Sequence, residues 1–199
     1  MNTSPAFSPE QIHAAAQALL RLRPAYKELL RFYEKIFIAQ EASKSSLDLE
    51  PVQVSSELRT IKRREKLPLV DVSDFSFDPR SARDLMLKVC GIIQSHNREM
   101  ADAARTIVRG LDNEIEPLVF FSSLLKDDDA YFDKTAAALE TDKNALAFVA
   151  YNSLKPSVVL CAEQLSGYLK DLFGWEKGYC PVCGNFPGLA VLDHDVLQA

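Results

Sequence analysis

Glycine is nearly missing from most of this sequence: only seven occur among 199 residues, and residues 1–90 contain none. Basic residues are outnumbered by acidic ones, 23 to 28, so the formal net charge is −5 at pH 7. An acidic chain binds a phosphate backbone poorly, which disfavours nucleic acid as a partner. The longest uncharged apolar run, Ala145–Tyr151, is far shorter than the ~20 residues of a membrane span. We therefore expect a soluble, cytoplasmic protein without membrane insertion.

Cysteine is also scarce, with four in the whole chain. That number is too small for a disulfide scaffold, and a cytoplasmic setting would keep the thiols reduced. Cys90 and Cys161 each stand among apolar residues at helical spacing, where free cysteine usually packs as a small hydrophobic side chain. His13 and His96 have no cysteine or carboxylate at ligand spacing. The sequence therefore predicts core packing for Cys90 and Cys161 and no site at either histidine.

Caps and hydrophobic periodicity predict an all-α body. Ser8 to Gln11 has the pattern of a capping box with proline at the first helical position. Apolar residues then recur at spacings of three and four through most of the chain. The predicted helices begin at Ser8, at Pro24 and at Asp78, extend from Met100 to Gly110, and continue over 114–125, 128–139, 142–154 and 156–171. The interval Leu67–Phe77 is predicted to be an extended loop lying on the helices.

The composition changes near Leu172, where turn residues replace the helical pattern. Four of the seven glycines fall between Gly174 and Gly188. Glycine costs about 1 kcal/mol relative to alanine in a helix interior, but it suits turns. We expect two parts: an α-helical domain over 1–172, and a short turn-rich ribbon over 173–199 with strand-like alternation from Leu189.

Two charged clusters resemble sites without having the required pattern. Asp127 to Asp129 with Asp133 suggests calcium, but an EF-hand loop needs glycine at position 6 and glutamate at position 12, where this chain has Phe132 and Ala138. Carboxylates at a helix start, where the dipole favours them, explain the cluster. The basic run from Lys62 to Arg64 is interrupted by Glu65 and is interpreted as the solvated end of a helix.

The motif that carries chemistry is Tyr179-Cys180-Pro181-Val182-Cys183-Gly184. Two cysteines separated by two residues can place both sulfurs on one metal ion, and Gly184 lets the chain turn just beyond the second sulfur. Such a turn is typical of rubredoxin and zinc-ribbon knuckles, which hold iron or zinc with four ligands. Cys180 and Cys183 supply two. His194 follows at a distance that fits no familiar zinc-finger spacing, so the sequence predicts half a metal site.

Two other interpretations of Cys180 and Cys183 remain open. A thioredoxin-like dithiol uses the same spacing, but its cysteines open a helix after the first strand of a βαβ unit, whereas these follow a series of helices. The turn could also stay reduced and free of metal, because two ligands alone bind metal weakly. The corresponding alternative function is a thiol redox or metal-transfer enzyme using these two cysteines.

The segment Trp175 to Pro187, preceded by Lys155-Pro156-Ser157 and by Ala162-Glu163, resembles the formate dehydrogenase accessory (formation) proteins, the FdhE-like family. The stretches Pro24 to Gln40 and Pro68 to Phe77 also fit the family's helical region. The resemblance implies an α-helical domain followed by rubredoxin-like modules with several cysteine knuckles that bind iron. The family's further knuckles have no counterpart here, so we expect either a fragment or a shortened member.

The resemblance also implies a function. We expect a cytoplasmic accessory protein without catalytic residues, whose partner is a formate dehydrogenase catalytic subunit during assembly. The expected cofactor is iron, with zinc as the alternative, bound by Cys180 and Cys183. A third hypothesis is an unrelated helical interaction protein in which the knuckle is incidental.

Overall fold

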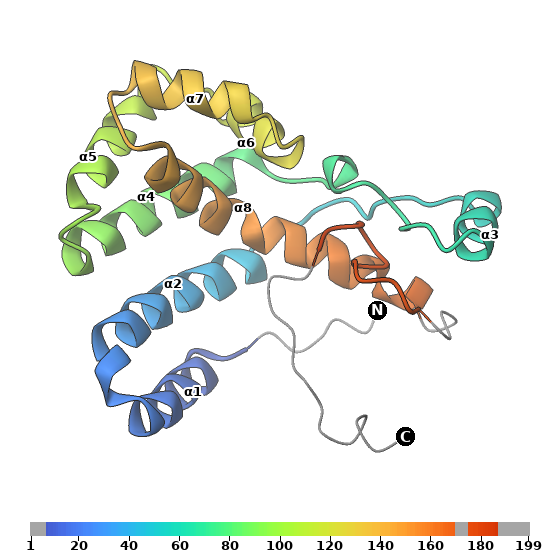
Figure 1. Cartoon of the computed structure of the whole chain (residues 1–199), viewed down its shortest axis with the longest axis horizontal. Helices are drawn as coiled ribbons and strands as arrows, with labels where there is room; N and C mark the ends of the chain where they lie inside the picture. The colour runs from blue at the N-terminus through green and yellow to red at the C-terminus, as the bar shows by residue number, and fades with distance from the viewer. Residues whose placement is uncertain (1–6, 170–174, 187–199) are drawn as a thin grey trace.

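The computed structural model describes residues 7–169 and 175–186, and within them it is all-helical (Figure 1). Eight α-helices and three short 3₁₀ helices follow one another without a β-strand in these residues. Their order is α1 (Pro9–Leu22), η1 (Pro24–Tyr26), α2 (Lys27–Ser45), α3 (Ser56–Arg64), η2 (Val72–Asp74), α4 (Pro79–His96), α5 (Ala101–Gly110), α6 (Pro117–Leu125), α7 (Asp129–Ala138), α8 (Lys143–Leu165) and η3 (Ser166–Leu169). The predicted all-α body is confirmed; a zinc-ribbon module is not seen in the described residues.

Local capping explains why most of these helices begin where they do. Ser8 accepts a hydrogen bond from the Gln11 backbone N–H, and the Gln11 side chain returns one to the Ser8 backbone, as the predicted capping box requires. Asp78, Asp128 and Asp142 cap α4, α7 and α8 by accepting a backbone N–H of the first turn, without the returning side-chain bond. Each such cap satisfies an N–H group that the first helical turn leaves without a partner.

The main core lies where α4 and α8 pack against each other and against α2, α5 and α6, while α7 covers α8. Its fully buried side chains are large and apolar: Phe120, Phe121, Ile36, Leu85, Met86, Ile93, Ile107, Leu146 and Val149. The two α6 aromatics within it, Phe120 and Phe121, meet edge-to-face with their ring centroids 5.2 Å apart. Cys90 is buried in this core, as predicted.

One predicted boundary is wrong. The helices expected over 142–154 and 156–171 are a single helix, α8, which runs from Lys143 to Leu165 through Pro156. Proline has no N–H, so it leaves the carbonyl four residues earlier, that of Asn152, without its helical partner. The buried Gln40 side chain of α2 donates a hydrogen bond to that carbonyl at 2.9 Å and to the Asn152 Oδ1 at 3.1 Å. Gln40 thus replaces the missing donor and lets the helix continue.

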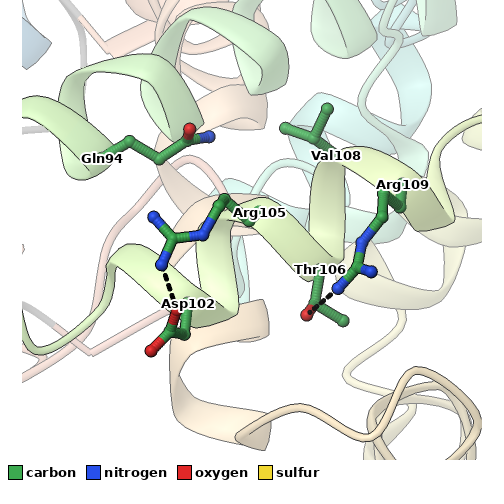
Figure 2. A pocket seen from close by; sticks show the side chains of 6 residues that line it. All are labelled: Gln94, Asp102, Arg105, Thr106, Val108 and Arg109. Atoms are coloured by element: carbon green, nitrogen blue, oxygen red, sulfur yellow. Dashed lines mark hydrogen bonds and ion pairs between the residues drawn. The ribbon is translucent and has the colours of Figure 1, made fainter.

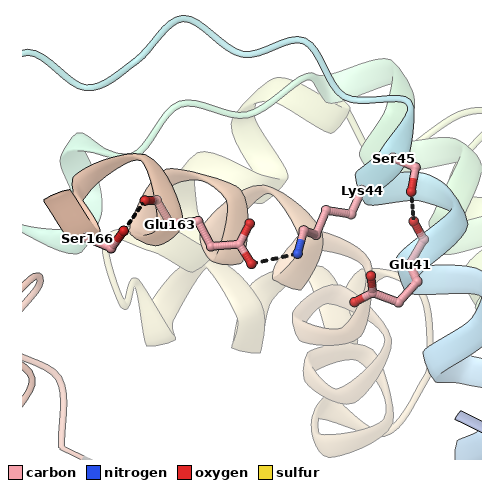
Figure 3. A network of polar contacts seen from close by, with 5 residues as sticks. All are labelled: Glu41, Lys44, Ser45, Glu163 and Ser166. Atoms are coloured by element: carbon pink, nitrogen blue, oxygen red, sulfur yellow. Dashed lines mark hydrogen bonds and ion pairs between the residues drawn. The ribbon is translucent and has the colours of Figure 1, made fainter. Parts of the chain in front are cut away.

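A second contact between α2 and α8 lies farther along both helices (Figure 3). Lys44 Nζ is 2.7 Å from Glu163 Oε1, and both side chains are largely removed from solvent. Beside the pair, the Glu41 Oε2 atom is buried and has no hydrogen-bond partner in the described residues. The α2–α8 interface is therefore partly polar, unlike the main core around α4.

The segment 143–169 is long and apolar enough to cross a membrane by length and composition alone. Within the fold, 56% of its most apolar window is buried. The criterion of an uninterrupted apolar run missed this segment because Asn152, Ser153 and Lys155 interrupt it. A helix buried at the centre of a helical fold passes the same test, so the segment does not by itself indicate a membrane.

Candidate functional site: a two-thiol knuckle

The predicted knuckle forms a closed turn between Cys180 and Asn185. The Gly184 N–H donates to the Cys180 carbonyl at 2.9 Å, and the Cys180 N–H donates to the Asn185 carbonyl at 2.8 Å. Gly184 has a φ of +78°, a conformation that glycine adopts without strain. A Cβ atom there would also lie 3.0 Å from Pro68 Cγ. Both the turn and its close approach to the helical body therefore require glycine.

The knuckle is docked on the loop that precedes η2. Leu69 and Val70 donate backbone hydrogen bonds to the carbonyls of Pro181 and Val182, both at 3.0 Å. The Val182 side chain, 4% exposed, completes a second core. This second core consists of Val54, Leu69, Val70, Phe75, Cys161, Leu165 and Val182, with Cys180 and Cys183 packed against it. The loop predicted over Leu67–Phe77 does lie on the helices, and it also receives the knuckle.

Two aromatic residues fix the chain that enters the knuckle. The Trp175 indole N–H donates to the Tyr179 carbonyl at 2.8 Å, and the two rings meet edge-to-face with centroids 5.4 Å apart. The Tyr179 hydroxyl donates to the Lys66 carbonyl at 3.2 Å. The knuckle is consequently attached to the helical body on both sides of Leu69.

The two knuckle thiols are neighbours, free and half-buried. Burial raises the pKa of the Cys183 thiol, the nearby Cys180 thiol adds to the rise, and the Asn185 N–H acts in the opposite direction. Burial raises the pKa of the Cys90 thiol to about 12, and it raises the pKa of the Cys161 thiol as well. Because the thiolate is the nucleophile and the metal ligand, full burial of Cys90 and Cys161 disfavours both roles, consistent with their predicted core positions.

The described residues offer half of a four-ligand metal site. Among 7–169 and 175–186, no cluster of three or more histidine, cysteine or carboxylate side chains could hold a metal ion. Two adjacent thiols with an N–H group facing one sulfur do fit two positions of a tetrathiolate. His194 and the strand expected from Leu189 lie outside the described residues. Metal binding at Cys180 and Cys183 stays a prediction.

The other predicted clusters have structural roles. Asp128 caps α7 by accepting the Tyr131 N–H, and Lys143 pairs with Asp129 and Asp133 at 2.7 Å each. The basic run is the last turn of α3, where Lys62 donates to the Leu69 carbonyl. The sequence predicts a helix end at the basic run but does not predict α3 itself.

The two histidines have partners that the sequence did not reveal. His13 Nδ1 lies 2.6 Å from Glu34 Oε1, which joins α1 to α2. His96 Nδ1 lies 3.1 Å from the Ile92 carbonyl within α4. Neither imidazole is hydrogen-bonded to Cys180 or Cys183 within the described residues, so neither forms a nucleophile–base pair with these thiols.

A groove of about 390 Å³ adjoins the knuckle. It runs between the end of α6, the exposed side of α8 and Asn185, and its lining is mostly apolar: Val72, Leu124, Leu125, Tyr151, Leu154 and Val158. Asp127 and Lys155 add one charge of each sign. Since Asn185 also faces the Cys183 sulfur, the groove and the thiols share one residue.

A second hollow, between α4 and α5, has no comparable chemistry (Figure 2). Arg105 pairs with Asp102, and Arg109 donates to the Thr106 hydroxyl at 3.1 Å, so both arginines that line it are already partnered within α5. Gln94 and Val108 complete the lining. We do not assign this hollow a function.

Comparison of the chain with protein-family models, with curated proteins and with solved structures finds no match. The resemblance to the formate dehydrogenase accessory proteins therefore rests on the residues quoted for it above.

Proposed function

We propose that this protein is an accessory factor that binds a formate dehydrogenase catalytic subunit during assembly and has no catalytic residues of its own. The observation that supports the proposal is the docked knuckle: a helical body holds two neighbouring thiols at its surface through the Leu69 and Val70 hydrogen bonds. The sequence around that knuckle also carries the most specific part of the family resemblance.

Cys180 and Cys183 are proposed as two ligands of an iron or zinc ion. Thiolates suit both metals, and both prefer four such ligands in structural sites. The remaining ligands would come from outside the described residues or from a second molecule. A bound ion would neutralise thiolates that burial otherwise disfavours, so metal and knuckle would stabilise each other.

The apolar groove beside the knuckle gives the proposed partner a place to bind. An extended segment lying along Leu124, Tyr151 and Val158 would end beside Asn185, next to Cys183. Tyr151 is 63% exposed, which makes it available to such a segment. Tyrosine is enriched at protein interfaces because its ring buries area while the hydroxyl stays hydrogen-bonded.

Thiol redox or metal-transfer chemistry is the second candidate, favoured by the adjacency of the two free thiols. In such a reaction both thiols would be oxidised to one disulfide while a substrate disulfide is reduced to two thiols. An efficient attacking thiol has a lowered pKa, whereas burial raises that of Cys183. Cys180 is also followed by a turn and not by a helix whose dipole would stabilise a thiolate.

A capture experiment tests the accessory function. The full chain, immobilised under reducing and anaerobic conditions, should retain a purified formate dehydrogenase catalytic subunit. Tyr151→Arg should weaken capture, while Leu118→Arg, at an exposed side chain that does not line the groove, should not. Failure of the unmodified chain to retain the subunit would contradict the proposal.

Metal content tests Cys180 and Cys183 as ligands, and a disulfide-reduction assay tests the redox alternative. After anaerobic loading with iron(II) or zinc(II), the chain should retain metal, and the double variant Cys180→Ser/Cys183→Ser should lose it. Cys90→Ala is the matched control, because it removes a thiol outside the knuckle. Catalytic reduction of insulin disulfides, dependent on Cys180, would instead favour the redox enzyme.

A further inference from the structure

The turn between α1 and α2 exposes large apolar side chains. We call residues 19–31, from the end of α1 through η1 to the start of α2, the hairpin cap. Four apolar residues in it are at least about half exposed: Leu19 at 49%, Leu22 at 72%, Tyr26 at 56% and Leu29 at 49%. No residue of α1 is fully buried, although the helix is amphipathic. An exposed apolar cluster of this kind marks a surface that another molecule covers.

The hairpin cap is also basic, in contrast to the rest of the chain. It carries Arg21, Arg23, Lys27 and Arg31 against a single acidic residue, Glu28, a net charge of +3 in a protein of net charge −5. All four cations are exposed. None of them forms an ion pair or a side-chain hydrogen bond within the described part of the chain. The cap is therefore a cationic surface that the protein itself does not neutralise.

Helix stability does not explain these cations. Arg21 is in the last turn of α1, where the helix dipole favours a positive charge. Lys27, however, is the first residue of α2, where the positive end of the dipole disfavours a cation. A neutral or acidic residue would stabilise α2 better at that position. An anionic partner accounts for Lys27 where intramolecular stability does not.

The hairpin cap is separate from the knuckle. In Figure 1 the α1–α2 turn lies at one end of the long axis, and α3 lies at the opposite end. The knuckle lies on the α3 side of the molecule, on the loop that follows α3. A ligand of the cap would leave the thiols and their groove accessible.

We infer that the hairpin cap binds an acidic amphipathic segment of a partner protein, with the segment's apolar face on Leu19, Leu22 and Tyr26 and its carboxylates on the surrounding cations. Arginine and tyrosine are enriched at protein–protein interfaces, and three of the four cations are arginine. Lysine, in contrast, is depleted at protein–protein interfaces, and the cap has only one. The predominance of arginine beside an exposed tyrosine thus favours a protein segment, and the membrane alternative is an outcome of the test.

The test uses the full chain, isotope-labelled for NMR, and a synthetic acidic helical peptide with leucines on one face. The peptide should shift the amide signals of residues 19–31 and leave those of Leu69 and Val70 unchanged. Arg23→Glu/Lys27→Glu should weaken binding about tenfold, because two attractions become repulsions. Arg98→Glu/Lys134→Glu makes the same charge change at two exposed residues elsewhere and should leave the affinity unchanged.

Further experiments measure how much the apolar and the charged contacts contribute to peptide binding. Leu22→Ser should weaken peptide binding, whereas Leu118→Ser, at an exposed leucine of α6, should not. A scrambled peptide of equal composition should bind more weakly than the amphipathic one. Raising the ionic strength from about 0.1 M to about 1 M shortens the screening length from about 10 Å to about 3 Å and should weaken binding.

Three outcomes would overturn the inference: no shifts in residues 19–31, equal loss of binding in the control variants, or binding that is unchanged when the peptide is scrambled.

Binding to vesicles of phosphatidylcholine and phosphatidylglycerol tests the membrane alternative. If the chain binds them through the cap while the peptide does not compete, the surface is a membrane contact and the proposed partner class is wrong. Circular dichroism of each variant confirms that the helices are intact. None of these results depends on capture of a formate dehydrogenase subunit, so the two proposals fail separately.

Discussion

The main core and the second core of this protein are built differently. The main core joins helices that pack face to face, and its largest side chains, such as Phe120 and Leu85, are almost completely excluded from solvent. The second core joins a helix end, an irregular loop and the knuckle, and its last component, Val182, arrives more than a hundred residues after Leu69. The two meet at Val72 and Val158, which contact both. We infer that the main core provides most of the stability and the second core positions the thiols.

Removing a large side chain from the main core should have the greatest effect. Phe120→Ala leaves a cavity among Phe121, Phe132 and their neighbours, and we expect it to lower the free energy of unfolding by about 3–5 kcal/mol. Phe186→Ala, at a side chain 81% exposed, is the control and should change little. Chemical denaturation measures both. Similar losses in the two variants would show that the main core does not dominate stability.

Removing the hydrogen bond from Gln40 to the Asn152 carbonyl should have the next largest effect on stability. Gln40→Leu leaves the Asn152 carbonyl without a donor in the interior, which costs about 1–3 kcal/mol. In a Pro156→Ala background the restored backbone N–H can bind that carbonyl, so the same substitution should cost less. A double-mutant cycle gives the difference as a coupling energy. Equal costs in both backgrounds would show that Gln40 does not compensate for the proline.

A substitution in the second core should act locally. Val182→Ala removes two methyl groups from the contact with Leu69 and Val70, and we expect a loss of about 1–2 kcal/mol. Amide exchange at Leu69 and Val70 should become faster, because their acceptors are the Pro181 and Val182 carbonyls. Val119→Ala, at an exposed valine of α6, is the control.

Deleting residues 173–199 extends the comparison and tests the predicted domain division. Cooperative unfolding of the main core should persist, whereas the amides of Leu69 and Val70 should lose protection. Hydrogen exchange with mass spectrometry separates the two regions. Global unfolding of the shortened chain would contradict a helical domain that is stable by itself.

The effect that should be smallest at neutral pH concerns the Cys90 thiol, and it emerges only under alkaline conditions. The folded state raises the pKa of Cys90 from 9.0 to about 12, so it favours the protonated thiol. Its contribution to stability is complete below pH 9 and should be lost as pH rises from about 9 toward 12. Comparing the pH dependence of unfolding for the unmodified chain and Cys90→Ala isolates this contribution. Identical slopes above pH 9 would contradict it.

Much of the fold could be predicted because its signals are local. Ser8, Asp78 and Asp128 are caps within one turn of the helices that they start, and the amphipathic stripes follow directly from residue spacing. The predicted helix break at Pro156 was wrong, because the hydrogen-bond donor that replaces the missing proline N–H is the side chain of Gln40 in α2. The available signal was that Gln40 follows Phe32 and Ile36 at a spacing of four, on the buried side of α2, but this does not identify its acceptor.

In the candidate site, too, local features could be predicted from the sequence and long-range contacts could not. The turn at Cys180 and Cys183 could be predicted from the spacing and from Gly184, since both act within a few residues. Its attachment to Leu69 and Val70 could not, because backbone hydrogen bonds between distant segments leave no residue-specific signal. The basic hairpin cap was also not recognised, because charge runs along a chain do not show which side chains remain unpaired after folding.

Pro156 also has a kinetic consequence. Until α2 has packed on α8, the Asn152 carbonyl has no donor, so residues 143–165 are a weaker helix alone than within the fold. Completing this helix requires closure of a loop spanning 112 positions. Such a non-local step slows folding relative to helices that form from neighbouring residues. We therefore expect the longest helix of the described chain to be completed late in folding, once the chain's N-terminal and C-terminal halves have met.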